Sequence, residues 1–231
     1  MDEQSLSLSF GHSLTEDVAG IVGEYAEFGL DALVEDGLLK DIPVVSTAVA
    51  VYKIGKSIHE RHHIAKLVSF LNEINKGIAD EEQRQKYREK FNGNEKFRNK
   101  ELEYILILID RYISFDKPQM LAKLYLAYLD GEIIWEEFTM YAEVIDRFLL
   151  LDAGKLISSG GKTIVHRNMG DEYVLRLVAL GLMTEITDTS PFVEHENGNI
   201  GITWGTLTKS ISTDKVYKRT EFGDKLANIL R

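Results

Sequence analysis

A run of five residues, His59, Glu60, Arg61, His62 and His63, matches the pattern H-E-x-x-H. On a helix, His59 and His63 share one face at positions i and i+4, and this spacing suits zinc ligands. Glu60 would then serve as the general base that activates a zinc-bound water. In zinc sites of this kind the two middle positions are usually uncharged, whereas this chain has an arginine and a third histidine there.

A zinc hydrolase would also need a third protein ligand. The candidates are His12 upstream and Glu73 downstream, and neither belongs to a motif of its own. The residues around the run are charged, as on a solvated helix. We therefore predict a solvated helix face with no metal, no cofactor and no catalytic residue. The alternatives are a weak metal-binding patch and a zinc hydrolase centred on His59 and His63.

Nucleophilic catalysis has no recognisable basis in the sequence. The chain contains no cysteine, which excludes disulfides, thiolate metal sites and a cysteine nucleophile, and favours a reducing, cytoplasmic setting. No serine lies in a G-x-S-x-G elbow. We predict that the protein is not an enzyme.

Charge is distributed unevenly along the chain, which carries a net charge of −10. Residues 1–60 contain 11 acidic and 3 basic residues, whereas residues 61–115 contain 9 acidic and 11 basic residues. An acidic N-terminal third repels phosphate backbones and anionic lipids. A nucleic-acid contact would therefore have to lie in the middle or at the C-terminal end of the chain.

The first two thirds of the chain have the apolar periodicity of helices. After a flexible lead, residues 1–12, we predict a helical bundle over residues 13–157. Its helices are predicted at residues 13–35, 42–54, 57–76, 80–91, 101–113, 116–129 and 132–151. Residues 104–109 are apolar on every side and suit a strand as well, but the charged flanks favour a helix.

The pattern changes after residue 157, where segments shorten and β-branched residues appear. We predict a helix over 171–182, strands over 183–187, 199–204 and 215–219, and a final helix over 221–230 that Thr220 caps. This order is typical of a winged helix with an added terminal helix. The predicted fold is mainly α: an irregular helical bundle followed by a small α+β winged-helix-like module, residues 158–231.

Several stretches resemble known families. They are residues 42–47 (IPVVST) with 55–62 (GKSIHERH), residues 101–113 with 117–138, and residues 180–182 (LGL) with 217–223 (YKRTEFG). The first two resemble uncharacterised helical proteins of bacterial and prophage genomes. The last resembles the closing signature of winged-helix modules and the C-terminal part of the abortive-infection alpha proteins. The resemblance implies a bacterial, phage-related origin and brings no catalytic motif.

The winged-helix-like module offers four candidate contacts to nucleic acid, namely Arg176, Lys215, Lys218 and Arg219. A recognition helix should present basic residues to the major groove. The predicted helix begins instead with two acids, and a cluster of three basic residues on a strand is a small footprint for DNA. We therefore treat a DNA-binding transcriptional regulator as an alternative and do not favour it.

The apolar stretch 42–54 is a further candidate surface. Its 13 residues span roughly 20 Å as a helix, against about 30 Å of bilayer core, and this favours a buried helix. The alternatives are a hairpin of residues 18–58 that inserts into membranes and a surface for another protein, with Val45, Val49 and Tyr52 as contacts. The leading hypothesis is a cytoplasmic, non-enzymatic interaction factor in phage defence, immunity or phage–host interplay, which binds a protein partner or itself.

Overall fold

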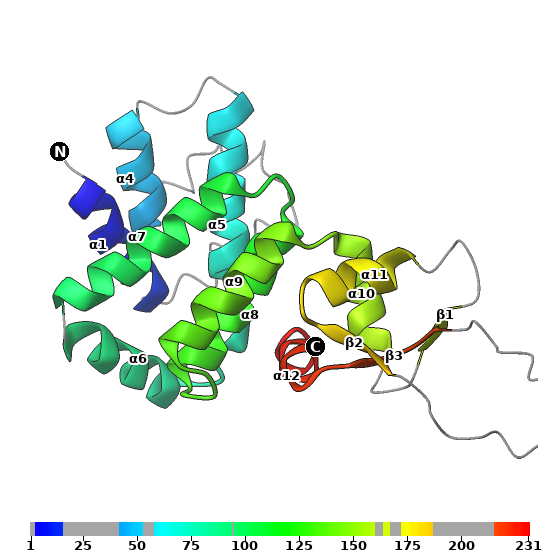
Figure 1. Cartoon of the computed structure of the whole chain (residues 1–231). Coiled ribbons are helices and arrows are strands. Elements are labelled where there is room, and N and C mark those ends of the chain that lie inside the picture. Colours follow the sequence, from blue (N-terminus) through cyan, green and yellow to red (C-terminus); the bar gives the residue numbers. More distant parts are fainter. Residues whose placement is uncertain are drawn as a thin grey trace, which may run out of the picture. The chain divides into compact units, whose positions relative to one another are not determined.

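The computed structural model describes residues 3–15, 42–52, 58–93, 95–159, 164–166, 172–186 and 215–231. Over these residues the chain is mainly helical, with ten helices and one small sheet of three strands. It divides into a helical unit that ends at Leu150 and an α+β unit that begins at Leu151; Leu230 alone departs from this division and groups with the helical unit. Figure 1 shows both units.

The helical unit contains seven described helices. They are α1 (Glu3–Thr15), α4 (Pro43–Tyr52), α5 (Ile58–Gly77), α6 (Glu81–Gly93), α7 (Glu95–Arg111), α8 (Asp116–Leu129) and α9 (Trp135–Arg147). The predicted helices over 57–76, 80–91 and 116–129 are confirmed within one or two residues. Pro118 lies in the first turn of α8, where its missing N–H costs nothing, and Gly131 follows the helix with a φ of +81°.

Helix α5 is central to the helical unit and packs against α8, α7, α4 and α1. Its apolar side is fully buried, including Leu67, Phe70, Leu71 and Ile74. Burial of such side chains contributes about 1.5–3 kcal/mol each, so this stripe fixes the helix in place. Figure 1 shows α1 and α4 beside each other, next to α5.

The predicted flexible lead over residues 1–12 is wrong for residues 3–12, because they belong to α1, which runs from Glu3 to Thr15. The predicted start of a helix at residue 13 is wrong for the same reason. Phe10 and Leu14 are buried, and the Phe10 ring lies 5.6 Å from that of Phe70. The Oγ of Ser13 accepts a hydrogen bond from the N–H of Val44 at 2.9 Å. This tertiary packing orders a segment whose own amphipathic signal is weak. Residues 16–35 of the predicted helix lie outside the described residues.

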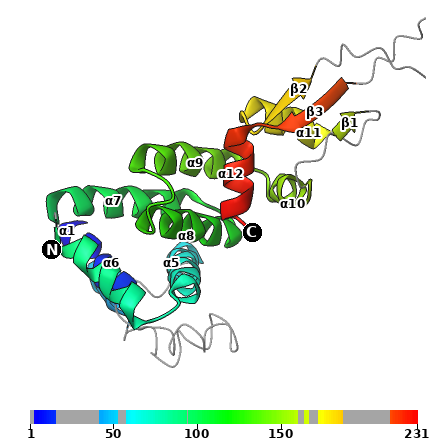
Figure 2. The same cartoon turned by 90° about the horizontal axis from the view of Figure 1, so that it is seen from below.

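The apolar stretch 104–109 forms a helix, as predicted, within α7. Leu108 and Ile109 are buried, while Ile107 is 59% exposed. The predicted helix over 132–151 is wrong at its C-terminal end, because Phe148 adopts an extended backbone (φ −70°, ψ 137°) and separates α9 from the next helix. In both views α9 lies beside α8 (Figure 2).

The C-terminal unit combines short helices with an antiparallel sheet. Its elements are α10 (Leu150–Ser158), β1 (Ile164–His166), α11 (Glu172–Ala179), β2 (Met183–Ile186), β3 (Lys215–Arg219) and α12 (Glu221–Ile229). The strand order is β1-β3-β2, which places β3 in the middle (Figure 2). The strands over 183–187 and 215–219 are confirmed, the strand β1 was not predicted, and the strand over 199–204 lies outside the described residues.

A tight contact joins the end of α11 to the start of α12. Gly181 has a φ of +74°, and its carbonyl accepts a hydrogen bond from the Thr220 hydroxyl at 2.7 Å. The same hydroxyl oxygen accepts the N–H of Gly223 at 3.0 Å and so caps α12, as predicted. A Cβ on Gly223 would lie 2.1 Å from the carbonyl oxygen of Leu182, so this position requires glycine.

No helix among the described residues is both long enough and apolar enough to cross a membrane.

Candidate functional site, an anchored loop between two helices

Four residues, Tyr112 to Phe115, connect α7 to α8, and we call them the α7–α8 connection. Side chains from successive turns of α5 bind the backbone carbonyls of this connection and of the last turn of α7. A loop usually gains its order from its own turn residues or from apolar packing. This loop is held instead by polar side chains that lie 44 to 51 residues away in the sequence.

Lys66 is the most buried of these side chains, with 2% exposure. Its ammonium donates hydrogen bonds to the carbonyl oxygen of Asp110 at 2.6 Å and to that of Tyr112 at 2.8 Å. These carbonyls lie at the C-terminal end of α7, where backbone acceptors lack partners and the helix dipole is negative. Burial lowers the pKa of Lys66, and the nearby carboxylate of Asp110 partly offsets this effect.

One histidine of α5 contacts the connection and another contacts the end of α7. The Nε2 atom of His62 lies 2.7 Å from the carbonyl oxygen of Ile113, and its ring lies 4.6 Å from the ring of Phe115. The Nδ1 atom of His63 lies 3.1 Å from Oδ1 of Asp110. Burial lowers the pKa of His63; Asp110 opposes this effect, and the nearby Lys66 adds to it.

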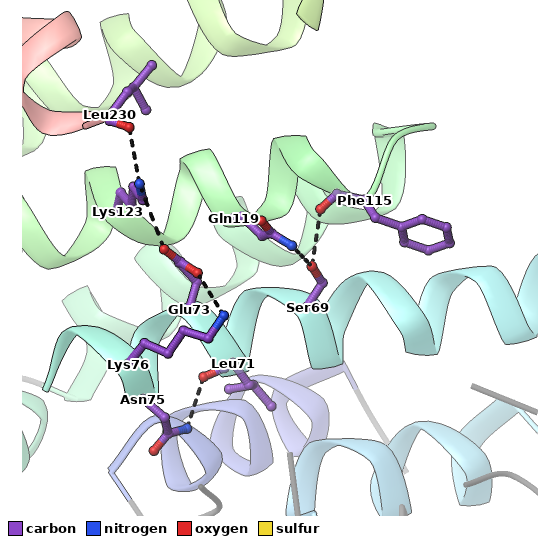
Figure 3. Close-up of polar contacts among 9 residues, drawn as sticks. All are labelled: Ser69, Leu71, Glu73, Asn75, Lys76, Phe115, Gln119, Lys123 and Leu230. Atoms are coloured by element: carbon purple, nitrogen blue, oxygen red, sulfur yellow. Dashed lines mark hydrogen bonds and ion pairs between the residues drawn. The ribbon is translucent and has the colours of Figure 1, made fainter. Parts of the chain in front are cut away.

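Ser69 completes the series one turn further along α5. Its hydroxyl donates a hydrogen bond to the carbonyl oxygen of Phe115 at 3.1 Å and accepts one from the Gln119 amide, also at 3.1 Å. Figure 3 shows this bridge from α5 to both the connection and α8. On the next turn, Glu73 lies between Lys76 of its own helix and Lys123 of α8, as Figure 3 also shows.

The side chains of the connection point in different directions. Tyr112 is buried with 2% exposure, and the ammonium of Lys117 lies 5.7 Å from the centre of its ring. Ile113 is 87% exposed and Phe115 is 42% exposed. A fixed backbone therefore presents two large apolar side chains to solvent. Single exposed apolar residues are common on protein surfaces; here two of them extend from a backbone that side chains of α5 hold in place.

The histidines of the H-E-x-x-H run thus have neighbours other than a metal. His63 lies against Asp110, and His62 lies against the connection. Within the described ranges, no group of three or more potential ligands is placed to hold a metal ion, and neither His12 nor Glu73 completes one. His59 is exposed at the start of α5.

Three of the four residues predicted to contact nucleic acid bind acidic side chains of their own unit. Arg176 makes a two-pronged contact with Asp152, at 2.6 and 2.7 Å. The ammonium of Lys215 lies 3.0 Å from the carboxylate of Glu185.

The third of these residues, Arg219, is 8% exposed. It lies 2.7 Å from Asp224 and donates a hydrogen bond to the carbonyl oxygen of Leu156. Buried in this way, Arg219 offers no phosphate contact, contrary to the prediction. Lys218 is exposed.

Val45, Val49 and Tyr52 were predicted to form a partner or membrane surface on the apolar stretch 42–54. Val45 is 1% exposed, so the prediction that it faces a partner is wrong for this conformation. It is covered because α4 packs against α1. The side chains of Val49 and Tyr52 lie outside the described ones.

The apolar tip at Ile113 was not identified from the sequence. The apolar pattern of residues 101–113 predicts that Ile113 is the last buried residue of a helix, so nothing in the sequence indicates that it is exposed. The capping pattern at residues 116–118 marks only where the connection ends.

Comparison with known proteins gave no matching family model, no similar curated protein and no matching solved structure.

Proposed function

We propose that the protein is a non-enzymatic interaction factor that binds another protein through the α7–α8 connection, with Ile113 and Phe115 as the central contacts. The observation that supports this proposal is the anchoring of the connection by His62, Lys66 and Ser69. A contact surface that is already ordered loses less conformational entropy on binding. The resemblance to prophage-encoded proteins suggests phage defence, immunity or phage–host interplay in the cytoplasm as the setting.

The test is affinity capture of the tagged protein from cells that express it natively, at low and at high salt. We expect a stoichiometric protein partner that survives high salt, because apolar contacts are insensitive to screening. Ile113→Ser should abolish its capture. The matched control is Ile134→Ser, since Ile134 is 60% exposed and lies on the connection between α8 and α9. Equal capture by both variants, or no partner at all, would overturn the proposal.

The oligomeric state separates binding of a partner from self-association. Light scattering at several protein concentrations should give a monomer, because the proposed surface serves a different protein. A dimer that Ile113→Ser dissociates would assign the same surface to self-association instead.

A DNA-binding winged-helix-like module is the second candidate function. It is supported by the antiparallel order β1-β3-β2 and by α11, which directly precedes β2. Lys215 and Lys218 are both exposed on β3, and Lys215 lies 3.0 Å from Glu185. Lys218 would then be the principal basic contact. This function predicts salt-dependent binding to duplex DNA that Lys218→Ala weakens, with the salt slope falling by about 0.9 for a lost phosphate contact. Binding that is unchanged by this substitution would remove the candidate.

A membrane-active hairpin over residues 18–58 is a third proposal from the sequence, and most of that segment lies outside the described residues. Leakage of anionic or neutral vesicles tests it directly. No leakage with folded protein would reject it.

A further inference from the structure

Glu101 of α7 is a buried carboxylic acid, with 6% exposure. Its Oε1 atom accepts a hydrogen bond from the hydroxyl of Tyr128 on α8 at 2.6 Å. Among the described residues, no lysine, arginine or histidine forms an ion pair with it. A buried charge is costly unless an opposite charge and further hydrogen bonds compensate for it. With one donor and no cation, the ionised form of Glu101 is poorly compensated.

The hydrogen-bond partner of Glu101 belongs to a group of packed aromatic rings. The Tyr128 ring lies 5.8 Å from that of Tyr125, 5.4 Å from that of Trp135 and 6.1 Å from that of Phe138. The faces of aromatic rings carry partial negative charge, so they do not stabilise an anion. This setting favours the neutral form of the carboxyl group.

The hydroxyl of Tyr125 is a second uncompensated polar group near Glu101. Its side chain is fully buried, and its oxygen has no hydrogen-bond partner in the part of the chain that the structure describes. Burial raises the pKa of Tyr125, and the nearby charge of Glu101 adds to this effect. A protonated carboxyl group carries an O–H donor, and a hydroxyl oxygen can accept it. One proton on Glu101 therefore removes a buried charge and supplies a donor close to an unpaired oxygen.

The ionisable groups nearest to this pair do not replace that proton. Burial raises the pKa of Tyr128, and so do Glu101 and, to a smaller extent, Glu136 of α9, so the Tyr128 hydroxyl remains a neutral donor. Arg98 of α7 acts on Tyr125 through its charge but forms no ion pair with Glu101. Glu136 adds a second negative charge on this side of the helical unit, which disfavours ionisation of Glu101 further.

Ionisable groups on the other elements that pack against α7 have contacts elsewhere or are exposed. Lys90 and Tyr87 of α6 donate hydrogen bonds to acceptors at the end of α8. On α5, Lys66 and His63 contact the C-terminal end of α7. His12 of α1 is exposed. The charge of an ionised Glu101 is therefore not balanced by the described side chains of these helices.

We propose that Glu101 is a proton-binding switch of the helical unit, whose carboxyl group strengthens the contact between α7 and α8 when it is neutral and weakens this contact when it is ionised. Burial raises the pKa of Glu101 above its ordinary value of 4.5, and the hydrogen bond from Tyr128 opposes this effect only in part. The folded protein thus binds the proton more tightly than the unfolded chain does. The stability that the proton contributes is complete below pH 4.5 and is lost as the pH rises through the pKa of the folded state. The switch is a property of the free protein and does not depend on the proposed partner.

A carbon NMR titration of the glutamate Cδ atoms in the full chain measures the protonation of Glu101 directly. Glu101→Gln identifies the signal, because it removes that resonance. We expect a titration midpoint above pH 4.5. In Tyr128→Phe the midpoint should lie at a still higher pH, because the hydrogen bond that favours the carboxylate is lost. A midpoint at or below pH 4.5 would overturn the switch, and so would a midpoint that Tyr128→Phe leaves unchanged.

Urea unfolding at pH 7.5 and pH 5.0 measures the effect on stability. Glutamine has the shape of a protonated glutamate and no charge, so Glu101→Gln should unfold at a higher urea concentration than the wild type at pH 7.5. This difference should shrink at pH 5.0, since each unit by which the pKa is raised corresponds to a tenfold change in the folding equilibrium constant.

The matched control is Glu103→Gln, because Glu103 lies on the same helix and is half-buried. It should differ from the wild type by the same amount at both pH values. Burial lowers the pKa of His63, so this residue makes stability depend on pH in the opposite direction. Comparison of each variant with the wild type at the same pH cancels that contribution. A difference between Glu101→Gln and the wild type that is the same at both pH values would refute the proposal.

Discussion

Replacement of Lys66 by methionine tests whether the buried ammonium anchors the α7–α8 connection. Methionine retains the unbranched apolar stem, so the packing of α5 against its neighbours changes little. What is lost is the pair of hydrogen bonds to the carbonyl oxygens of Asp110 and Tyr112, at 2.6 and 2.8 Å. Both carbonyls lie at the end of α7, beyond the last complete helical hydrogen bonds.

The expected cost is about 2 kcal/mol. Each hydrogen bond from a charged group contributes about 1.5–3 kcal/mol, so the two together contribute about 3–6 kcal/mol. Part of this is regained, because the variant no longer has to desolvate an ammonium in a site that is 2% exposed. With a typical urea dependence of about 2 kcal/mol per molar, the unfolding midpoint should fall by about 1 M.

Urea unfolding followed by circular dichroism measures this shift, and hydrogen exchange locates it. Lys76→Met is the matched control, since Lys76 lies on the same helix with 62% exposure and its ammonium is 3.7 Å from Glu73. Surface pairs of this kind contribute at most about 1 kcal/mol. A Lys66→Met shift no larger than that of the control, with unchanged protection at residues 111–115, would refute the anchoring role.

Two further predictions concern the C-terminal unit. Gly223→Ala should destabilise it by about 1–3 kcal/mol in urea unfolding, because the new Cβ would lie 2.1 Å from the Leu182 carbonyl oxygen. Gly154→Ala is the control and should be neutral or stabilising, because its new Cβ would meet no neighbouring atom within 4 Å. Arg176→Ala should lower the free energy of unfolding, because it leaves the carboxylate of Asp152, which is 2% exposed, without its partner. Asp152→Ala should cost less, since Arg176 is 43% exposed and can be hydrated; the reverse order of the two unfolding energies would contradict this reasoning.

The local sequence predicted most of the helices. Apolar periodicity located α5 and α8, and Thr220 predicted the start of α12, because caps and periodicity act within a few residues of the chain. Where the signal is weak, as in α1, order comes from packing against α4 and α5, and the local sequence does not contain that information.

The candidate site shows the same division. The sequence by itself determined that His59, His62, His63 and Lys66 lie close together on a helix. From the charged residues around them, this helix face was predicted to be solvated. Only the tertiary structure decided that Lys66 is buried and that Ile113 is exposed, because both depend on where α7 ends against α5. Burial of a lysine is costly unless hydrogen-bond acceptors surround its ammonium group. The acceptors of Lys66 are the carbonyl oxygens of Asp110 and Tyr112, more than 40 residues away in the sequence.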